Sequence, residues 1–292
     1  AIDTAAAETA IGTLGETLSL SSTRMAEGIV RIAVARMTGT VKEISVMRGL
    51  DPRDFTLFAY GGAGPLHAAA IAEELGMTRI VIPPMPGAFS AYGLLAADTR
   101  YDVTQTRLTK LDDTDWATLQ DILTPLRTRA TERLAEDGFT GDRVLLQTSL
   151  EMRYVGQAFE LATKLPNDAA TVADIENAFR AAYEERYGQL DDGPVEIVSF
   201  RVIGIGLSDR ADLPEHVVEG HLSDAENSRR PVVFSGAVQE TSIYRRPSLP
   251  TDLAVPGPAI IEEDGATTVV PPGFTASQDR YGIMILTKEG QA

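Results

Sequence analysis

The chain has 292 residues, of which 43% are hydrophobic and 23% are charged. These fractions are close to globular averages and exclude a disordered or fibrous chain, and the length suits one large or two ordinary domains. The 26 basic and 42 acidic residues give a formal charge of −16. Because so acidic a surface repels polyanions, we expect no nucleic-acid partner. Any bound anion would need a local site of backbone N–H groups and a few basic side chains.

Cysteine is absent and only three histidines occur. Disulfides, cysteine–zinc sites, iron–sulfur clusters and thiol nucleophiles are therefore excluded, and no HExxH or EF-hand spacing predicts a metal site. No apolar run approaches the roughly 18 residues of a membrane helix, so we expect no membrane partner. Residues 1–5 have neither an initiator methionine nor the basic region of a signal peptide. We therefore expect a cytoplasmic chain that starts inside a longer polypeptide.

The first part of the chain alternates predicted helices and strands. Helices are expected at 3–14, 22–48, 66–75 and 88–97, and short strands at 55–60 and 79–82. Apolar residues between Met25 and Ile44 recur at spacings of three and four, with Ser21 or Ser22 suited to the N-cap and Gly49 to the C-terminal end. The order strand, glycine turn, helix, strand over 55–82 predicts a βαβ crossover with parallel strands.

The remainder changes character. A strand at 101–108, a charged helix at 115–137, a hairpin of 144–154 and 158–165 around Gly156, a helix at 172–187 and a β-rich run at 195–207 indicate an α+β module. Residues 209–230 are polar and are interpreted as a linker. The Pro- and Gly-punctuated short strands of 231–292 predict a small all-β, barrel-like domain.

The segment Phe58-Ala59-Tyr60-Gly61-Gly62-Ala63-Gly64-Pro65-Leu66-His67 is the strongest local signal for a ligand site. Glycines between a parallel strand and a helix let a ligand lie against bare backbone, next to the unpaired N–H groups of the helix start. The alternative is a tight turn with no ligand. The segment is neither a Walker A nor a GxGxxG motif. His67 could touch a nucleotide or an acyl substrate, or simply pack at the helix start.

Other polar residues have two open interpretations each. Arg153, Tyr154 and Gln157 lie near the hairpin bend, where they could form a polar patch toward a substrate or a neighbouring subunit; alternatively Arg153 pairs with Glu151 or Glu160. The carboxylates of 262–264 could bind a metal, but a solvated turn is the expected state. The turn at Asp51 and Arg53 is expected to carry a surface ion pair.

Several motifs in register resemble the hydantoinase A/5-oxoprolinase family, which also holds acetone and acetophenone carboxylase subunits. The motifs are RGLDPRDF at 48–55, GGAGPLHA at 61–68, IPPMPGAFSAYG at 82–93, MRYVGQ at 152–157, PVEIV at 194–198, GPAIIEE at 257–263 and TTVVPPG at 267–273. The resemblance covers essentially the whole chain. Met85 and Tyr183 stand where the family often has histidine, so no histidine-based role is transferred to these positions.

The resemblance implies a fold and a reaction. Residues 1–108 would be the C-terminal portion of an actin-like (ASKHA) ATPase domain, followed by the α+β module at 109–208, the linker at 209–230 and the β domain at 231–292. Gly61, Gly62, Ala63 and Gly64 would lie against ATP. The family uses ATP and Mg²⁺ to activate an amide or ketone oxygen. The phosphate loops and metal carboxylates of the fold would precede residue 1, so this chain would hold about half of the nucleotide site.

The resemblance favours an ATP-dependent cyclic-amide hydrolase that works with a hydantoinase B-type subunit. The alternatives are a ketone carboxylase subunit of the same family and a non-catalytic module that docks the partner subunit. In each case the missing N-terminal lobe would be a partner of this chain. We therefore expect exposed apolar surface on the 22–48 helix or at a sheet edge, and weak ATP binding by this chain alone.

Overall fold

The computed structural model describes residues 3–166, 171–209 and 213–290. The chain divides into two compact units, one of residues 1–95 and 212–292 and the other of residues 96–211. The first unit contains α1 (Thr4–Thr17), α2 (Ser22–Ile44), β1 (Leu57–Phe58), α3 (Gly64–Leu75), β2 (Arg79–Ile82), nearly all of α4 (Phe89–Ala96), α7 (Leu222–Ala225), β7 (Glu226–Phe234), β8 (Ala237–Arg245), β9 (Val255–Pro256), β10 (Ala259–Glu263), β11 (Ala266–Val270), β12 (Phe274–Gln278) and β13 (Met284–Lys288). The second contains β3 (Thr99–Lys110), α5 (Trp116–Glu136), β4 (Val144–Tyr154), β5 (Leu161–Lys164), α6 (Val172–Tyr187) and β6 (Val195–Gly206). Among the described residues, no helix is long and apolar enough to cross a membrane.

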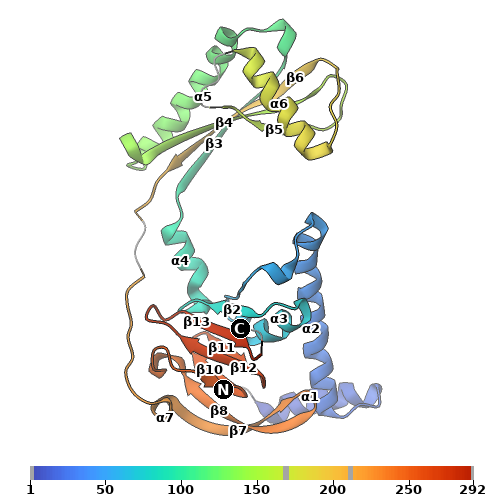
Figure 1. Ribbon diagram of the computed structural model, residues 1–292, viewed down its shortest axis with the longest axis vertical. Coiled ribbons are helices and arrows are strands. Elements are labelled where there is room, and N and C mark those ends of the chain that lie inside the picture. Colours follow the sequence, from blue (N-terminus) through green and yellow to red (C-terminus); the bar gives the residue numbers. More distant parts are fainter. Residues whose placement is uncertain (1–2, 167–170, 210–212, 291–292) are drawn as a thin grey trace. The chain divides into compact units, whose positions relative to one another are not determined.

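The first unit has two sheets, built from segments at both ends of the chain. One sheet has the strand order β1-β2-β13-β12-β9 and the other the order β11-β10-β8-β7. β1 precedes α3 in the sequence and β2 follows it. The two strands pair in parallel, which confirms the predicted βαβ crossover. β13 pairs antiparallel with β2 and places Met284 opposite Ile82. The late strands (red in Figure 1) therefore lie beside the early β2 and α3.

This pairing corrects the predicted boundaries. The prediction of a separate domain at 231–292 is wrong, because β12 and β13 extend the sheet of β1 and β2 and share their core. The predicted linker at 209–230 is also partly regular, since α7 and the start of β7 fall within it; its residues 210–212 lie outside the described residues. The α/β character with several sheets holds, and the assignment of 1–108 to an actin-like fold stays a prediction.

Small side chains let α3 lie close to the strands. Ala68, Ala69 and Ala72 are almost fully buried, and they share one core cluster with Ile80 and Ile82 of β2. The same cluster contains residues of the late strands, namely Val255, Ala259, Ile261, Val270, Phe274, Ala276, Met284 and Leu286. The residue after α3, Gly76, has a left-handed backbone (φ 70°) that ends the helix.

α2 begins where the sequence predicted, because the Ser21 hydroxyl accepts a hydrogen bond from the N–H of Arg24. It ends at Ile44, earlier than the predicted residue 48, and a short 3₁₀ turn leads to Gly49 with φ 76°. Its buried side includes Met25 and Val34. Three isoleucines of α2 are exposed, with Ile29 at 43%, Ile32 at 60% and Ile44 at 59%, whereas Val41 packs against the core.

The second unit is an antiparallel sheet of order β3-β6-β4-β5 that packs against α5 and α6 (Figure 1). β4 and β5 form the predicted hairpin around Gly156, whose φ is 95°. α6 spans the predicted residues, and Thr171 and Asp174 close a capping box at its start. The core joins Leu119 and Leu123 of α5 and Phe179 of α6 to strand residues, namely Met152, Tyr154, Val195, Ile197, Phe200 and Val202.

Candidate functional site

The predicted glycine turn connects β1 to α3, as expected. Gly61 has φ 87°, and its N–H donates a hydrogen bond to the carbonyl oxygen of Pro86 at 2.7 Å. The positive φ explains why a residue without a side chain stands there. Gly62 and Ala63 are exposed, whereas Gly61 and Gly64 are half-buried. The backbone of the turn is therefore accessible on one side.

The other side of the turn meets the connection between β10 and β11. A β-carbon added to Gly62 would lie 3.1 Å from the carbonyl oxygen of Gly265, and one added to Gly87 would lie 2.7 Å from it. This close backbone approach favours glycine at Gly87 strongly, whereas a β-carbon at Gly62 fits only if Gly265 moves by a few tenths of an ångström. Packing within the chain thus accounts for glycine at these two positions, and no ligand is needed to explain them. Binding of a nucleotide to the exposed side of the turn stays a prediction.

The start of α3 offers backbone donors at the same place. Its N-cap residue is Ala63, and no side chain of the described residues caps it. The first N–H groups of a helix have no partner within the helix and carry its positive dipole end, so they can receive an anion. Pro65 stands in the first turn, where its missing N–H costs nothing. His67 follows in the same turn and is half-buried.

An aromatic cluster lies beside the glycine turn and was not predicted. Phe58 at the end of β1 and Tyr60, two residues later, contact Phe89 of α4, with ring centroids 5.5 and 5.7 Å apart. Tyr92 stacks on Phe89 at 5.6 Å. Phe58 is 47% exposed and Tyr60 50%. The available signal was the spacing of Phe58 and Tyr60 on one side of a strand, and of Phe89 and Tyr92 one helical turn apart. Such rings can stack against a planar group or an apolar chain.

Arg153, Tyr154 and Gln157 lie in the second unit and form internal contacts. Arg153 donates to Glu196 at 2.8 Å and to Glu160 at 3.3 Å. The expected pair with Glu160 is confirmed, and the nearer partner is Glu196, which the sequence did not indicate. Tyr154 is only 2% exposed, so its ring is part of the core. Gln157 donates from Nε2 to the hydroxyl of Tyr183 at 2.9 Å.

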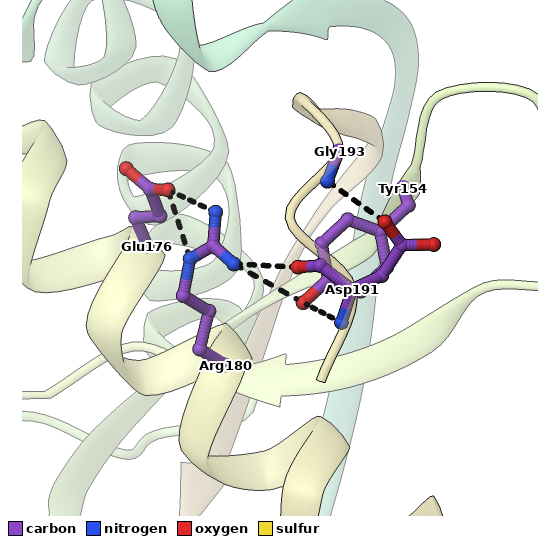
Figure 2. A network of polar contacts seen from close by, with 5 residues as sticks. All are labelled: Tyr154, Glu176, Arg180, Asp191 and Gly193. Atoms are coloured by element: carbon purple, nitrogen blue, oxygen red, sulfur yellow. Dashed lines mark hydrogen bonds and ion pairs between the residues drawn. The ribbon is translucent and has the colours of Figure 1, made fainter. Parts of the chain in front are cut away.

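Figure 2 shows the contacts that surround the Tyr154 hydroxyl. Arg180 of α6 donates to the Glu176 carboxylate at 2.8 Å, to the Asp191 carbonyl at 2.8 Å and to the Tyr154 hydroxyl at 3.4 Å. The Glu176 carboxylate raises the pKa of Arg180. The Asp191 side chain in turn accepts the N–H of Gly193 at 2.8 Å. This network holds the loop that leads into β6. Tyr154 of the MRYVGQ motif therefore stabilises the fold of this unit.

Of the carboxylates at 262–264, only Asp264 lies in the expected exposed turn. Glu262 and Glu263 belong to β10, and the side chain of Glu263 is buried in an ion pair with Arg246. Burial raises the pKa of Glu263, and the charge and hydrogen bond of Arg246 oppose this shift. The expected surface pair of Asp51 and Arg53 is present, and hydrogen bonds from Arg53 lower the pKa of Asp51 to about 2.

The described residues contain no group of three or more His, Asp or Glu side chains that could hold a metal ion. Two hollows of about 370 and 310 Å³ lie along α5, and neither is lined by a predicted site residue. The predicted site residues thus fall into two sets. The structure brings Gly61–Gly64 and His67 together in the first unit, and Arg153, Tyr154 and Gln157 together in the second.

Comparison with known proteins gives matches over most of the chain. A hydantoinase/oxoprolinase family model matches residues 1–103, and a hydantoinase/oxoprolinase C-terminal domain model matches residues 109–289. The caprolactamase subunit alpha of Pseudomonas jessenii is 33% identical over 94% of this chain and 41% of the relative. The acetone carboxylase beta subunit of Xanthobacter autotrophicus is 29% identical over 94% and 40%. The 5-oxoprolinase 1 of Arabidopsis thaliana is 28% identical over 90% and 21%.

Solved structures agree with these matches. The ATP-dependent caprolactamase from Pseudomonas jessenii superimposes with a TM-score of 0.76 and 31% identity, over 97% of this chain and 42% of that chain. A nucleotide-free structure of acetone carboxylase, solved for ATP-dependent acetone carboxylation, gives a TM-score of 0.78 and 27% identity, over 96% and 42%. The chain spans less than half the length of each of these relatives.

Proposed function

The chain belongs to the hydantoinase/oxoprolinase family, and from this premise we propose that it is the C-terminal part of an ATP-dependent cyclic-amide hydrolase. The glycine turn at 61–64 would form one wall of the nucleotide site. The observation that carries this proposal is the exposed backbone of Gly62 and Ala63 at the end of a parallel strand, next to the uncapped start of α3. Parallel sheets bind their ligands at this end of the strands.

The residues at this place suit a nucleotide in part. Free N–H groups at the start of α3 favour an anion, and the rings of Phe58 and Tyr60 offer apolar surface beside them. ATP would supply the phosphoryl group that turns the amide oxygen into a leaving group. The described residues provide no carboxylate cluster for Mg²⁺. We therefore propose that the Mg²⁺ ligands lie in a segment of the longer polypeptide that corresponds to the portion of the relatives not covered by this chain.

That portion is also the proposed partner of the exposed face of α2. Ile29, Ile32 and Ile44 present apolar surface to water, and Met47 in the following 3₁₀ turn is 80% exposed. Soluble proteins rarely leave extended apolar surface uncovered. A second partner, a hydantoinase B-type subunit, is proposed because two of the relatives are named as subunits.

The test of the function is ATP consumption by the longer polypeptide, alone and with its B-type subunit. Hydantoin, 5-oxoproline and caprolactam are supplied in turn, and ring opening is followed by mass spectrometry. ATP use that depends on one of these amides supports the proposal. ATP use with acetone and bicarbonate, and with none of the amides, would assign the alternative carboxylase activity, which the acetone carboxylase likeness favours. Absence of ATP use with every substrate would favour the docking module.

Calorimetry on the 292-residue chain tests the division of the nucleotide site. We expect weak ATP binding with or without Mg²⁺, because the groups that would contact the phosphates and the metal lie outside the chain. The longer polypeptide should bind ATP tightly and only with Mg²⁺. Tight, Mg²⁺-dependent binding by the 292-residue chain would contradict this division.

A further inference from the structure

A buried arginine joins the late strands to the loop at 83–87. Arg246 is 4% exposed. Its Nη2 donates hydrogen bonds to three carbonyl oxygens, those of Ile82 at 3.0 Å, Pro83 at 2.9 Å and Gly282 at 2.8 Å. Its Nη1 donates to the Glu263 carboxylate, and its Nε donates to the side chain of Gln278 at 3.4 Å. One guanidinium therefore connects the end of β2 to β10, β12 and the turn before β13.

Glu263 holds the middle of the same loop. Besides the bond from Arg246, its carboxylate accepts a hydrogen bond from the N–H of Met85. Met85 has φ 48° and ψ 55°, a left-handed conformation that costs free energy in a residue with a β-carbon. Its side chain is 65% exposed, so burial of this side chain does not offset the cost. Backbone held in such a conformation is commonly found at functional sites.

The loop is in turn connected to the glycine turn. The carbonyl oxygen of Pro86 accepts the N–H of Gly61 at 2.7 Å, and Gly87 and Gly62 both lie against Gly265. Gly265 follows Glu263 by two residues, so the ion pair and the close glycine contacts belong to one connection between β10 and β11. Arg246 and Glu263 are therefore connected to both loops through direct contacts and through Gly265.

We infer that Arg246 and Glu263 are positioning residues that hold the 83–87 loop and, through Pro86, the glycine turn in the geometry that receives the nucleotide. The inference rests on the proposed function of the turn. Both side chains are buried, so they act through the loops and do not touch the ligand.

Glu263→Gln is the main test variant, because it keeps the shape of the side chain and removes its charge. Glu262→Gln is the matched control. Glu262 is the preceding residue of the same strand, and it pairs with Arg230 at 3.9 Å on the surface. Arg246→Lys is the second variant and replaces Glu263→Gln if that protein does not fold. It keeps the charge, but a single ammonium cannot reach the five acceptors of the guanidinium.

The first measurement reports on the loop without any nucleotide. The chain contains no cysteine, so a Met85→Cys substitution carries the sole site for a thiol-specific spin label. We expect a restricted label in the otherwise unchanged chain and in the Glu262→Gln background. The label should be mobile in the Glu263→Gln and Arg246→Lys backgrounds. Equal mobility in all four backgrounds would overturn the inference.

The second measurement is the KM for ATP of the longer polypeptide in its amide-dependent reaction. Misplacement of the turn should raise this KM about tenfold in Glu263→Gln and Arg246→Lys, while Glu262→Gln leaves it unchanged. An unchanged KM in Glu263→Gln, in an enzyme that Gly62→Val inactivates, would overturn the inference and leave the proposed function intact. If Gly62→Val also has no effect, the assignment of the turn to the nucleotide fails, whatever the label shows.

Discussion

Gly62 and Gly265 approach each other so closely that a β-carbon on Gly62 would lie 3.1 Å from the Gly265 carbonyl oxygen. The two residues belong to segments about 200 positions apart in the chain. Their contact closes one side of the glycine turn and leaves the other side exposed. A substitution at Gly62 therefore tests packing against Gly265 as well as access to the backbone of the turn.

The Gly62→Val substitution should abolish ATP-dependent turnover and leave the fold largely intact. Its backbone φ is not in the left-handed region, so the cost comes from the Gly265 contact and should be about 1–3 kcal/mol of unfolding free energy. Gly93→Ala is the control, because nothing lies within 4 Å of a β-carbon in that exposed helical position. The control should gain up to about 1 kcal/mol. Urea unfolding and ATP turnover are measured on both, and full activity in Gly62→Val would contradict the proposed site.

Replacement of Tyr154 should separate a structural from a catalytic role. Tyr154→Ala removes a ring that is 2% exposed and should cost about 3–5 kcal/mol. Tyr154→Phe removes only a hydroxyl with two contacts at 3.4 Å and should cost about 0.5–1.5 kcal/mol while most activity remains. Tyr187→Ala, at a 42% exposed ring of the same cluster, should lose much less than Tyr154→Ala. Inactivity of a folded Tyr154→Phe enzyme would instead place the hydroxyl in the reaction.

The burial of Glu263 should appear in the pH dependence of stability. Because burial raises its pKa above the ordinary 4.5, the folded state holds this proton more tightly than the unfolded state does. The stability that results is fully present below pH 4.5 and is lost as the pH rises through the native pKa. The unfolding free energy of the parent chain, relative to Glu263→Gln, should therefore fall as the pH rises.

Chemical denaturation between acid and neutral pH measures this difference, and Glu262→Gln corrects for the general effect of removing one negative charge. A relative stability that instead rises with pH would show that the attraction to Arg246 outweighs the cost of burial.

Substitutions on the exposed face of α2 should leave the stability of this chain almost unchanged and should lower the stability of the longer polypeptide. Ile32→Ser should change the stability of the 292-residue chain by no more than about 0.5 kcal/mol, because Ile32 is 60% exposed. Val34→Ala, two residues on and 8% exposed, should cost about 1–3 kcal/mol in the same chain. In the longer polypeptide Ile32→Ser should lower the unfolding temperature, and Lys42→Ala on the same helix should not. An unchanged unfolding temperature for Ile32→Ser would show that this face is not covered.

Local features of the sequence predicted most elements of regular structure. Strand β2 and helix α6 have their predicted bounds, since a short apolar run and a capped amphipathic segment are specified by neighbouring residues. The parallel pairing of β1 and β2 followed from the order of elements. The local signal for β12 is weak, because its sequence, FTASQ, has few of the large apolar or β-branched residues that indicate a strand.

The sequence determined where local elements lie along the chain, and the tertiary structure decided which distant segments contact one another. By itself the sequence determined the place of the glycine turn, the strand before it and the helix after it, because backbone conformation at glycine and proline is a local property. Only the tertiary structure decided that β13 pairs with β2, that Gly265 lies against Gly62, and that Glu263 is buried beside Arg246. Contacts between segments so far apart depend on which surfaces pack together in the core of the whole unit. The residues next to each segment in the sequence do not determine that packing.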